Sequence, residues 1–152
     1  MRKLLLALVV TFTLQSCSSD SENRTDNTPQ FTGNWKLTAK EVNGLNVPVS
    51  DCEDQFNWYR FQTSGAAQKG EATLNSPTGT VFCNQVVYES TYDVDQENNV
   101  LTIFKETSTE KYSIIELTAN RFKIRKYNIR ANSGAEVNIP IQNQVIETCT
   151  KQ

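Results

Sequence analysis

The feature that most constrains the fold is a strict two-residue alternation of side-chain types between residues 86 and 95. One face carries mainly apolar and aromatic side chains, and the other carries mainly polar and acidic ones. This period predicts a β-strand with one buried face and one solvated face, as in antiparallel sheets. The predicted core set is Val86, Tyr88, Ser90, Tyr92 and Val94, and the opposite set is Val87, Glu89, Thr91, Asp93 and Asp95.

The rest of the chain after residue 30 repeats this strand pattern between turn signals, and no segment of useful length has a helical period. Pro140 makes 137–141 an edge piece or a loop. About eight strands in sequence fit an all-β, eight-stranded up-and-down antiparallel barrel or, alternatively, a two-sheet β-sandwich. Successive hairpins favour the barrel. The predicted strands are 35–39, 56–61, 69–74, 86–95, 100–104, 112–117, 122–127 and 145–149.

The N-terminus has the organisation of an export signal. Arg2 and Lys3 precede an apolar run over residues 4–14, which is shorter than the roughly 20 residues that span a membrane. The run ends at Leu14-Gln15-Ser16-Cys17, which resembles the bacterial lipobox. This resemblance implies that residues 1–16 are a lipoprotein signal peptide and that Cys17 carries the lipid. The alternative is an ordinary signal peptide with an incidental cysteine.

Residues 17–30 follow as a polar stretch that has no large apolar side chain to bury. We expect a lipidated cysteine and a disordered tether here, followed by one domain over residues 31–152. Ser18 after the cysteine resembles the pattern that directs lipoproteins to the outer membrane. The expected location is therefore the outer membrane, through a lipid anchor, on the periplasmic face or at the cell surface.

Charge and composition exclude several functions. Removal of Arg2 and Lys3 from the 15 basic residues leaves 13 against 17 acidic ones, a net charge of −4, which argues against broad binding to nucleic acid. The chain contains no histidine, and no nucleophile elbow or phosphate loop occurs. We expect no enzyme, no cofactor and no metal. An acidic cluster at Asp51, Glu53 and Asp54 could bind calcium, but a solvated loop is the favoured interpretation.

Three cysteines remain in the expected domain, Cys52, Cys83 and Cys149. An exported compartment permits disulfides, and an odd number leaves one thiol unpaired. Cys52 and Cys83 both lie beside predicted strand ends, so we favour a disulfide between them. The alternative is that Cys149 pairs with one of the others.

The segment Gly33-Asn34-Trp35 resembles the Gly-x-Trp signature that opens lipocalins. With the lipobox, the polar tether, Cys52 and Cys83, and the aromatic 56–61 segment, the domain resembles the lipocalin-like lipoproteins of Bacteroidetes. The resemblance implies that Gly33 and Trp35 form the closed end of the barrel.

The lipocalin pattern also places an arginine of the last strand over the tryptophan. The last predicted strand here has none, and only Lys151 follows it. Arg121, Arg125 or Arg130 could take that place.

A barrel of this size either holds one small ligand or is filled by its own side chains. The resemblance favours a binding protein for a small hydrophobic or amphiphilic ligand. The alternative is a non-enzymatic interaction module of the envelope with a packed interior. Oligomeric state stays open. The candidate ligand-binding residues are Trp58, Tyr88, Tyr92, Phe104, Tyr112 and Phe122.

Overall fold

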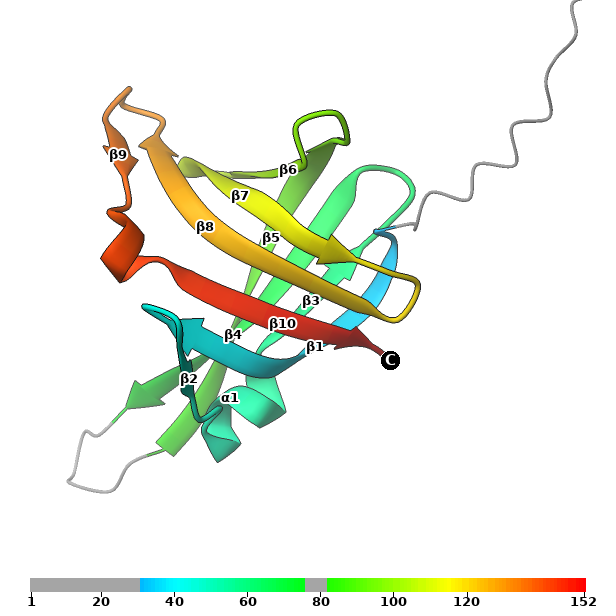
Figure 1. The fold of residues 1–152 in the computed structure, drawn as a ribbon, viewed down its shortest axis with the longest axis vertical. Coiled ribbons are helices and arrows are strands. Elements are labelled where there is room, and N and C mark those ends of the chain that lie inside the picture. Colours follow the sequence, from blue (N-terminus) through cyan, green and yellow to red (C-terminus); the bar gives the residue numbers. More distant parts are fainter. Residues whose placement is uncertain (1–30, 76–81) are drawn as a thin grey trace, which may run out of the picture.

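The computed structural model describes residues 31–75 and 82–152, and the expected signal peptide, Cys17 and tether lie outside them. Strands dominate the chain (Figure 1), and the helices are short. None of the helices in the described part is long and apolar enough to cross a membrane. The elements are β1 (Gly33–Val42), β2 (Leu45–Val47), α1 (Asp51–Phe56), β3 (Trp58–Phe61), β4 (Ala66–Asn75), β5 (Phe82–Asp95), β6 (Val100–Lys105), β7 (Ser108–Leu117), β8 (Arg121–Ala131), β9 (Glu136–Asn138), the 3₁₀ helix η1 (Ile141–Asn143) and β10 (Val145–Lys151).

The strands close into an eight-stranded antiparallel barrel. From β3 to β8 each strand pairs with the next one in sequence, and β10 then pairs with both β1 and β8. The short strands β2 and β9 are additions to the ends of β1 and β8. The expectation of a barrel rather than a sandwich is confirmed. Closure pairs every strand of the barrel on both sides, so no long edge is left to aggregate.

The alternation on β5 is present in the structure. Tyr88, Ser90, Tyr92 and Val94 are partly buried, while the residues between them are exposed. Tyr92 and Val94 pack against the core. The two-residue period therefore identified the inner face from Tyr88 onward. The prediction of Val86 as a core residue is wrong, since residues 82–87 lie toward the far end of the β4–β5 hairpin and Val86 is 37% exposed.

A β-bulge in β1 changes which side chains face inward. Leu37 pairs with Cys149, but the next pair is Ala39 with Thr148, so Thr38 is an extra residue. Such an insertion shifts the alternation by one position. Trp35 and Leu37 face the core as expected, whereas Ala39 does not share their face, and Lys40 and Val42 line the interior instead.

The prediction of a strand over 56–61 is wrong at its start. Residues 51–56 form helix α1, and only Trp58–Phe61 is extended. Ser50 caps the helix, because its side chain accepts a hydrogen bond from the Glu53 amide while the Glu53 side chain accepts one from the Ser50 amide. The acidic residues predicted to form a loop occupy the first turn of α1, where negative charge is favourable.

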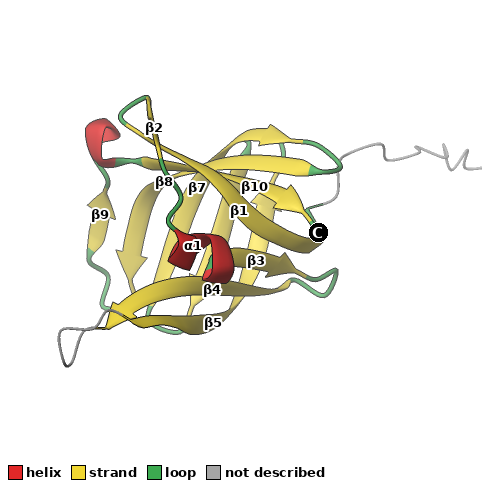
Figure 2. Ribbon diagram, turned by 90° about the horizontal axis from the view of Figure 1, so that it is seen from below, coloured by secondary structure: helices red, strands yellow, loops and turns green. Residues whose placement is uncertain are grey.

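Helix α1 lies across the gap that the short strand β3 leaves between β1 and β4 (Figure 2). The predicted disulfide between Cys52 and Cys83 is confirmed and attaches the helix to β5, and Cys149 is a buried thiol. Gly70 permits close packing here, since a Cβ at this position would lie 2.7 Å from the Phe56 carbonyl oxygen.

The core fills one end of the barrel with aromatic rings. Phe122 packs against Trp35 with 4.9 Å between ring centroids and against Phe31 with 5.1 Å, and Phe61 lies 4.5 Å from Phe31. We call this the aromatic end. The opposite end, where β1, β4, β6 and β8 finish, is the mouth. Among the described residues, the core cluster draws on β1, β3, β4, β6, β7, β8 and β10.

Candidate functional site

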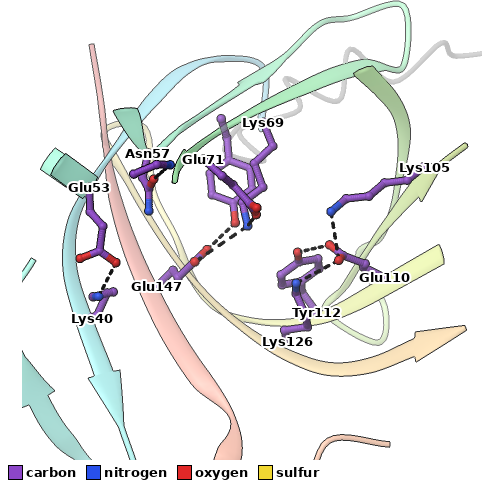
Figure 3. A network of polar contacts seen from close by, with 12 residues as sticks. Lys40, Glu53, Asn57, Lys69, Glu71, Lys105, Glu110, Tyr112, Lys126 and Glu147 are labelled. Carbon is purple, nitrogen blue, oxygen red and sulfur yellow. Dashed lines mark hydrogen bonds and ion pairs between the residues drawn. The ribbon is translucent and has the colours of Figure 1, made fainter. Parts of the chain in front are cut away.

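Two neighbouring cavities open at the mouth of the barrel. The first has a volume of about 320 Å³, and the second has a volume of about 580 Å³. Glu71 and Lys126 line both of them, so the two spaces share a wall. Figure 3 shows the charged side chains that project into this region. The interior therefore changes from aromatic at one end to ionic at the other.

One group of charged residues comes from β4 and β10. The Lys69 ammonium lies 2.6 Å from a Glu71 carboxylate oxygen and 4.0 Å from one of Glu147. The buried Tyr59 hydroxyl donates a hydrogen bond to the other Glu147 oxygen. We call Lys69, Glu71 and Glu147 the acidic cluster, because two carboxylates face one ammonium.

Lys69 is only 6% exposed, yet its surroundings favour the charged form. Burial by itself lowers the pKa of this lysine, but Glu147 and Glu71 more than offset that effect and hold the pKa above its usual value. Burial raises the pKa of Glu71, and the neighbouring Lys69 reverses this, so the net pKa is lowered. Lys69 and Glu71 are thus both ionised at neutral pH.

A second group comes from β6, β7 and β8. The ammonium groups of Lys105 and Lys126 each lie 3.0 Å from the same Glu110 oxygen, Oε1. The Tyr112 hydroxyl donates a hydrogen bond of 2.6 Å to the other oxygen. We call Lys105, Lys126 and Glu110 the basic cluster, because two ammonium groups face one carboxylate.

Glu110 is held ionised by this arrangement. Burial raises its pKa, but Lys126, the Tyr112 hydroxyl and Lys105 together lower it to about 2. Lys126 differs, since burial and the positive charge of Lys69 lower its pKa more than Glu110 raises it. Lys126 therefore lies in a site where further negative charge would be favourable.

A further ion pair lies at the rim. The bulge in β1 turns Lys40 into the first cavity, where its ammonium contacts the Glu53 carboxylate of α1. Apolar side chains line the same cavity beside these charges, among them Val42, Ile124 and Val145. The mouth thus offers an ionic region and an apolar wall within one space.

The sequence matches the family described as lipocalin-like domain over residues 31–124, which extends from before β1 into β8. The match covers more than half of the chain and the greater part of the closed barrel. The chain belongs to the lipocalin-like domain family. No curated protein matches it.

The lipocalin-like barrel brings two of the six predicted ligand-binding residues to the cavities. Tyr112 lines the first cavity, and Tyr88 lines the second beneath the Lys105 ammonium, 4.9 Å from its ring. Tyr92 and Phe122 pack with the rings of the aromatic end. They belong to the core of the lipocalin-like domain.

Trp58 and Phe104 were predicted to face the interior, and both predictions are wrong. Tyr59 and Phe61 are buried on β3, so Trp58 takes the opposite face, where Arg60 lies over its ring. Ile103 is buried on β6, which turns its neighbour Phe104 outward, where it is 44% exposed. Both strands are short and aromatic or apolar on both faces, so the period alone did not identify the inner one.

The structure places Gly33 and Trp35 at the aromatic end. Trp35 is fully buried, and its indole N–H donates a 2.8 Å hydrogen bond to the Phe31 carbonyl. The cation over its ring is Lys151, at 5.2 Å, in place of the arginine of the lipocalin pattern. Gly33 has a φ of +134°, and a Cβ there would lie 2.6 Å from Lys151 Cε.

The sequence analysis missed the ionic residues of the mouth. Charged positions were assigned to solvated faces, as is usual for single residues. The available signal was the position of Lys69 and Glu71 on the same side of β4 as Ala67, which is buried. The overlooked residues are Lys69, Glu71, Lys105, Glu110, Lys126 and Glu147.

Proposed function

We propose that this lipocalin-like protein binds a small amphiphilic ligand in the mouth of its barrel. The observation that carries the proposal is the first cavity, in which buried ion pairs stand beside apolar side chains. Ligand sites combine apolar walls with a few placed polar groups in this way. The polar group of the ligand lies at the ionic residues, and its apolar part lies against Val42, Ile124 and Val145.

Two observations distinguish this ligand from a purely hydrophobic one. The aromatic rings pack against one another, and the hollow of about 310 Å³ at this end lies beside them, between the β5–β6 turn and the end of β7. The first cavity is instead lined by Lys69, Glu71 and Lys126. A ligand with no polar group would displace water from these charged groups without forming hydrogen bonds to them, which costs free energy. The same cavities favour binding over the alternative of an interaction module with a filled interior.

The proposed role is binding and not catalysis. The low pKa values of Glu110 and Glu71 make both carboxylates weak bases, and lysine ion pairs hold them in place. A general base needs a pKa near the working pH. These features suit a site that recognises charge.

Uptake of an amphiphile by the unlipidated segment 18–152 tests the proposal, since this segment contains the core cluster of the described residues and both cavities. We expect native mass spectrometry to show a co-purified or added octyl-chain amphiphile bound one to one. Val145→Trp should fill the apolar part of the first cavity and reduce uptake at least tenfold.

Val137→Trp is the matched control, because Val137 lies on β9 and is exposed. It should bind as the wild type does, and circular dichroism should show both variants folded. If no amphiphile binds the wild type, the binding role is wrong. If both variants bind equally well, the assignment of the ligand to the first cavity is wrong.

We further propose that the protein is an outer-membrane lipoprotein of the Bacteroidetes type, anchored through Cys17. The support is the lipobox-like sequence Leu14-Gln15-Ser16-Cys17 behind a basic and apolar leader. A clickable fatty acid fed to a Gram-negative host should label the wild type and Cys149→Ala but not Cys17→Ser. Label on Cys17→Ser would contradict the assignment. Membrane fractionation and protease treatment of whole cells would then separate periplasmic from surface display.

A further inference from the structure

The two ionic clusters of the mouth have opposite net charges. The acidic cluster has two carboxylates for one ammonium, and the basic cluster has two ammonium groups for one carboxylate. They come from different parts of the barrel wall, β4 with β10 and β6 with β7 and β8, and stand apart in Figure 3. Among the described residues, no ion pair within 4.0 Å joins one cluster to the other. The two surpluses therefore compensate each other only at longer range across the cavities, where Lys105 and Lys126 add to the lowering of the Glu71 pKa.

The least compensated group in each cluster lies on a cavity wall. Glu147 is 4.0 Å from Lys69 and accepts a hydrogen bond from the neutral Tyr59 hydroxyl, whereas Glu71 is 2.6 Å from Lys69, so Glu147 has the weaker ion pair of the two. Lys105 and Lys126 share a single oxygen of Glu110. Glu147 lines the first cavity and Lys105 the second, while Glu71 and Lys126 line both. A ligand at the shared wall reaches both signs of charge.

We propose that the ligand is zwitterionic, with its cationic group beside Glu71 and Glu147 and its anionic group beside Lys105 and Lys126. This inference rests on the proposed binding function and specifies its ligand class. A zwitterion compensates both surpluses at once, whereas a singly charged ligand compensates one and leaves the other desolvated. The lowered pKa of Lys126 agrees, since an anion beside it would favour its charged form.

The ligand class is tested by isothermal titration calorimetry, in which five probes are titrated into the unlipidated segment 18–152 below their critical micelle concentrations. Four share an octyl chain and differ in head group: octylphosphocholine (zwitterionic), octyl phosphate (anionic), octyltrimethylammonium (cationic) and octyl glucoside (neutral). Glycerophosphocholine carries the zwitterion without the chain. We expect octylphosphocholine to bind at least tenfold tighter than any other octyl probe, the gain of one charge-assisted contact.

Two variants assign the ends of the ligand. Lys126→Gln should weaken the binding of octylphosphocholine and octyl phosphate about tenfold and leave the binding of octyltrimethylammonium unchanged or tighter. Glu147→Gln should weaken the binding of octylphosphocholine and octyltrimethylammonium and leave the binding of octyl phosphate unchanged or tighter. The controls are Lys123→Gln and Glu41→Gln, which remove an ion pair between β8 and β1 that lines neither cavity. The controls should bind every probe as the wild type does. Thermal unfolding should confirm that each variant is folded.

The outcomes separate this inference from the binding role. Equal affinity for octyl glucoside and octylphosphocholine, or variant effects that do not follow head-group charge, would overturn the zwitterion while the binding role stands. Failure of every probe would overturn both. Binding of glycerophosphocholine as tight as that of octylphosphocholine would support the zwitterionic site but overturn the amphiphilic ligand of the proposed function, because this probe has no apolar chain.

Discussion

At the scale of single residues, Glu110 explains how the barrel tolerates charge inside it. Its side chain is almost completely buried, and both oxygens are occupied, one by two lysines and the other by the Tyr112 hydroxyl. A buried carboxylate without such partners would take up a proton. These partners keep Glu110 ionised. The Glu110 carboxylate also fixes the positions of the Lys105 and Lys126 ammonium groups at the cavity.

We predict that Glu110→Gln lowers the free energy of unfolding at pH 7 by about 3 kcal/mol, because it leaves two partly buried lysines without their carboxylate. The pKa of Glu110 is about 2 in the folded state against a usual 4.5. Its stabilising effect is therefore complete above about pH 4.5 and disappears as the pH falls toward 2. Urea unfolding at several pH values should show a steeper loss in this window for the wild type than for the variant.

The matched control is Glu116→Gln on the same strand. Glu116 is partly exposed and forms a long surface contact of 3.6 Å with Arg121, so its removal should change stability by less than about 1 kcal/mol. Equal acid dependence of the wild type and Glu110→Gln would show that Glu110 does not hold the depressed pKa.

At the scale of elements, α1 completes the wall that β3 leaves short. Strand β3 has four residues, so β1 and β4 separate beyond its start, and the helix lies between them. Asn57 ties the junction on both sides, since its side-chain oxygen accepts the Ala72 amide and its carbonyl accepts the Leu37 amide. The helix also brings Glu53 to Lys40 at the rim.

We predict that Cys52→Ser combined with Cys83→Ser lowers the free energy of unfolding by about 2–4 kcal/mol. The bond joins residues 31 apart in sequence and so restricts a long loop in the unfolded chain. Chemical denaturation with and without a reducing agent measures the effect. Reduction should destabilise the wild type and leave the double variant unchanged, and a reductant effect on the double variant would point to another disulfide.

At the scale of the whole molecule, the barrel divides into a packed end and a polar end. Aromatic rings fill the first, and charged clusters surround the cavities of the second. The packed end supplies the apolar burial that stabilises the fold. The ionic mouth contributes less to stability, because the attraction within a buried ion pair is largely offset by the cost of removing water from both charges. We assign the mouth to ligand recognition.

We predict that amide hydrogen exchange is slow at the aromatic end of the barrel and faster at the opposite end. The amides of Trp35, Phe122 and Cys149 should exchange only on global unfolding, because their strands pair on both sides around the aromatic core. Amides near Leu74 and Phe82, whose side chains are exposed at the far end of the β4–β5 hairpin, should exchange much faster. NMR-detected exchange measures both groups. Early exchange along the β8–β10 pairing would show that the barrel is open in solution.

The sequence by itself determined the class of fold and the aromatic end. The two-residue period requires strands with one buried face, and successive turns require neighbouring strands to pair, so a series of antiparallel hairpins followed from local patterns and favoured a barrel over a sandwich. Gly33 and Trp35 marked the first strand, and the positions of Cys52 and Cys83 indicated their disulfide. Helix α1 escaped prediction because its six residues are fewer than two turns, too few to establish a helical period.

Only the tertiary structure decided what the interior contains. An alternating pattern indicates that the two faces of a strand differ. It does not indicate which face is inside when charged and aromatic side chains occur on both faces, as on β3 and β6. The bulge at Thr38 adds a further change, since one extra residue turns Lys40 inward. The charges of the mouth are stable there because partners from distant strands surround them, such as Glu110 for Lys126 and Glu147 for Lys69. These partnerships depend on barrel closure, which no local stretch of sequence encodes.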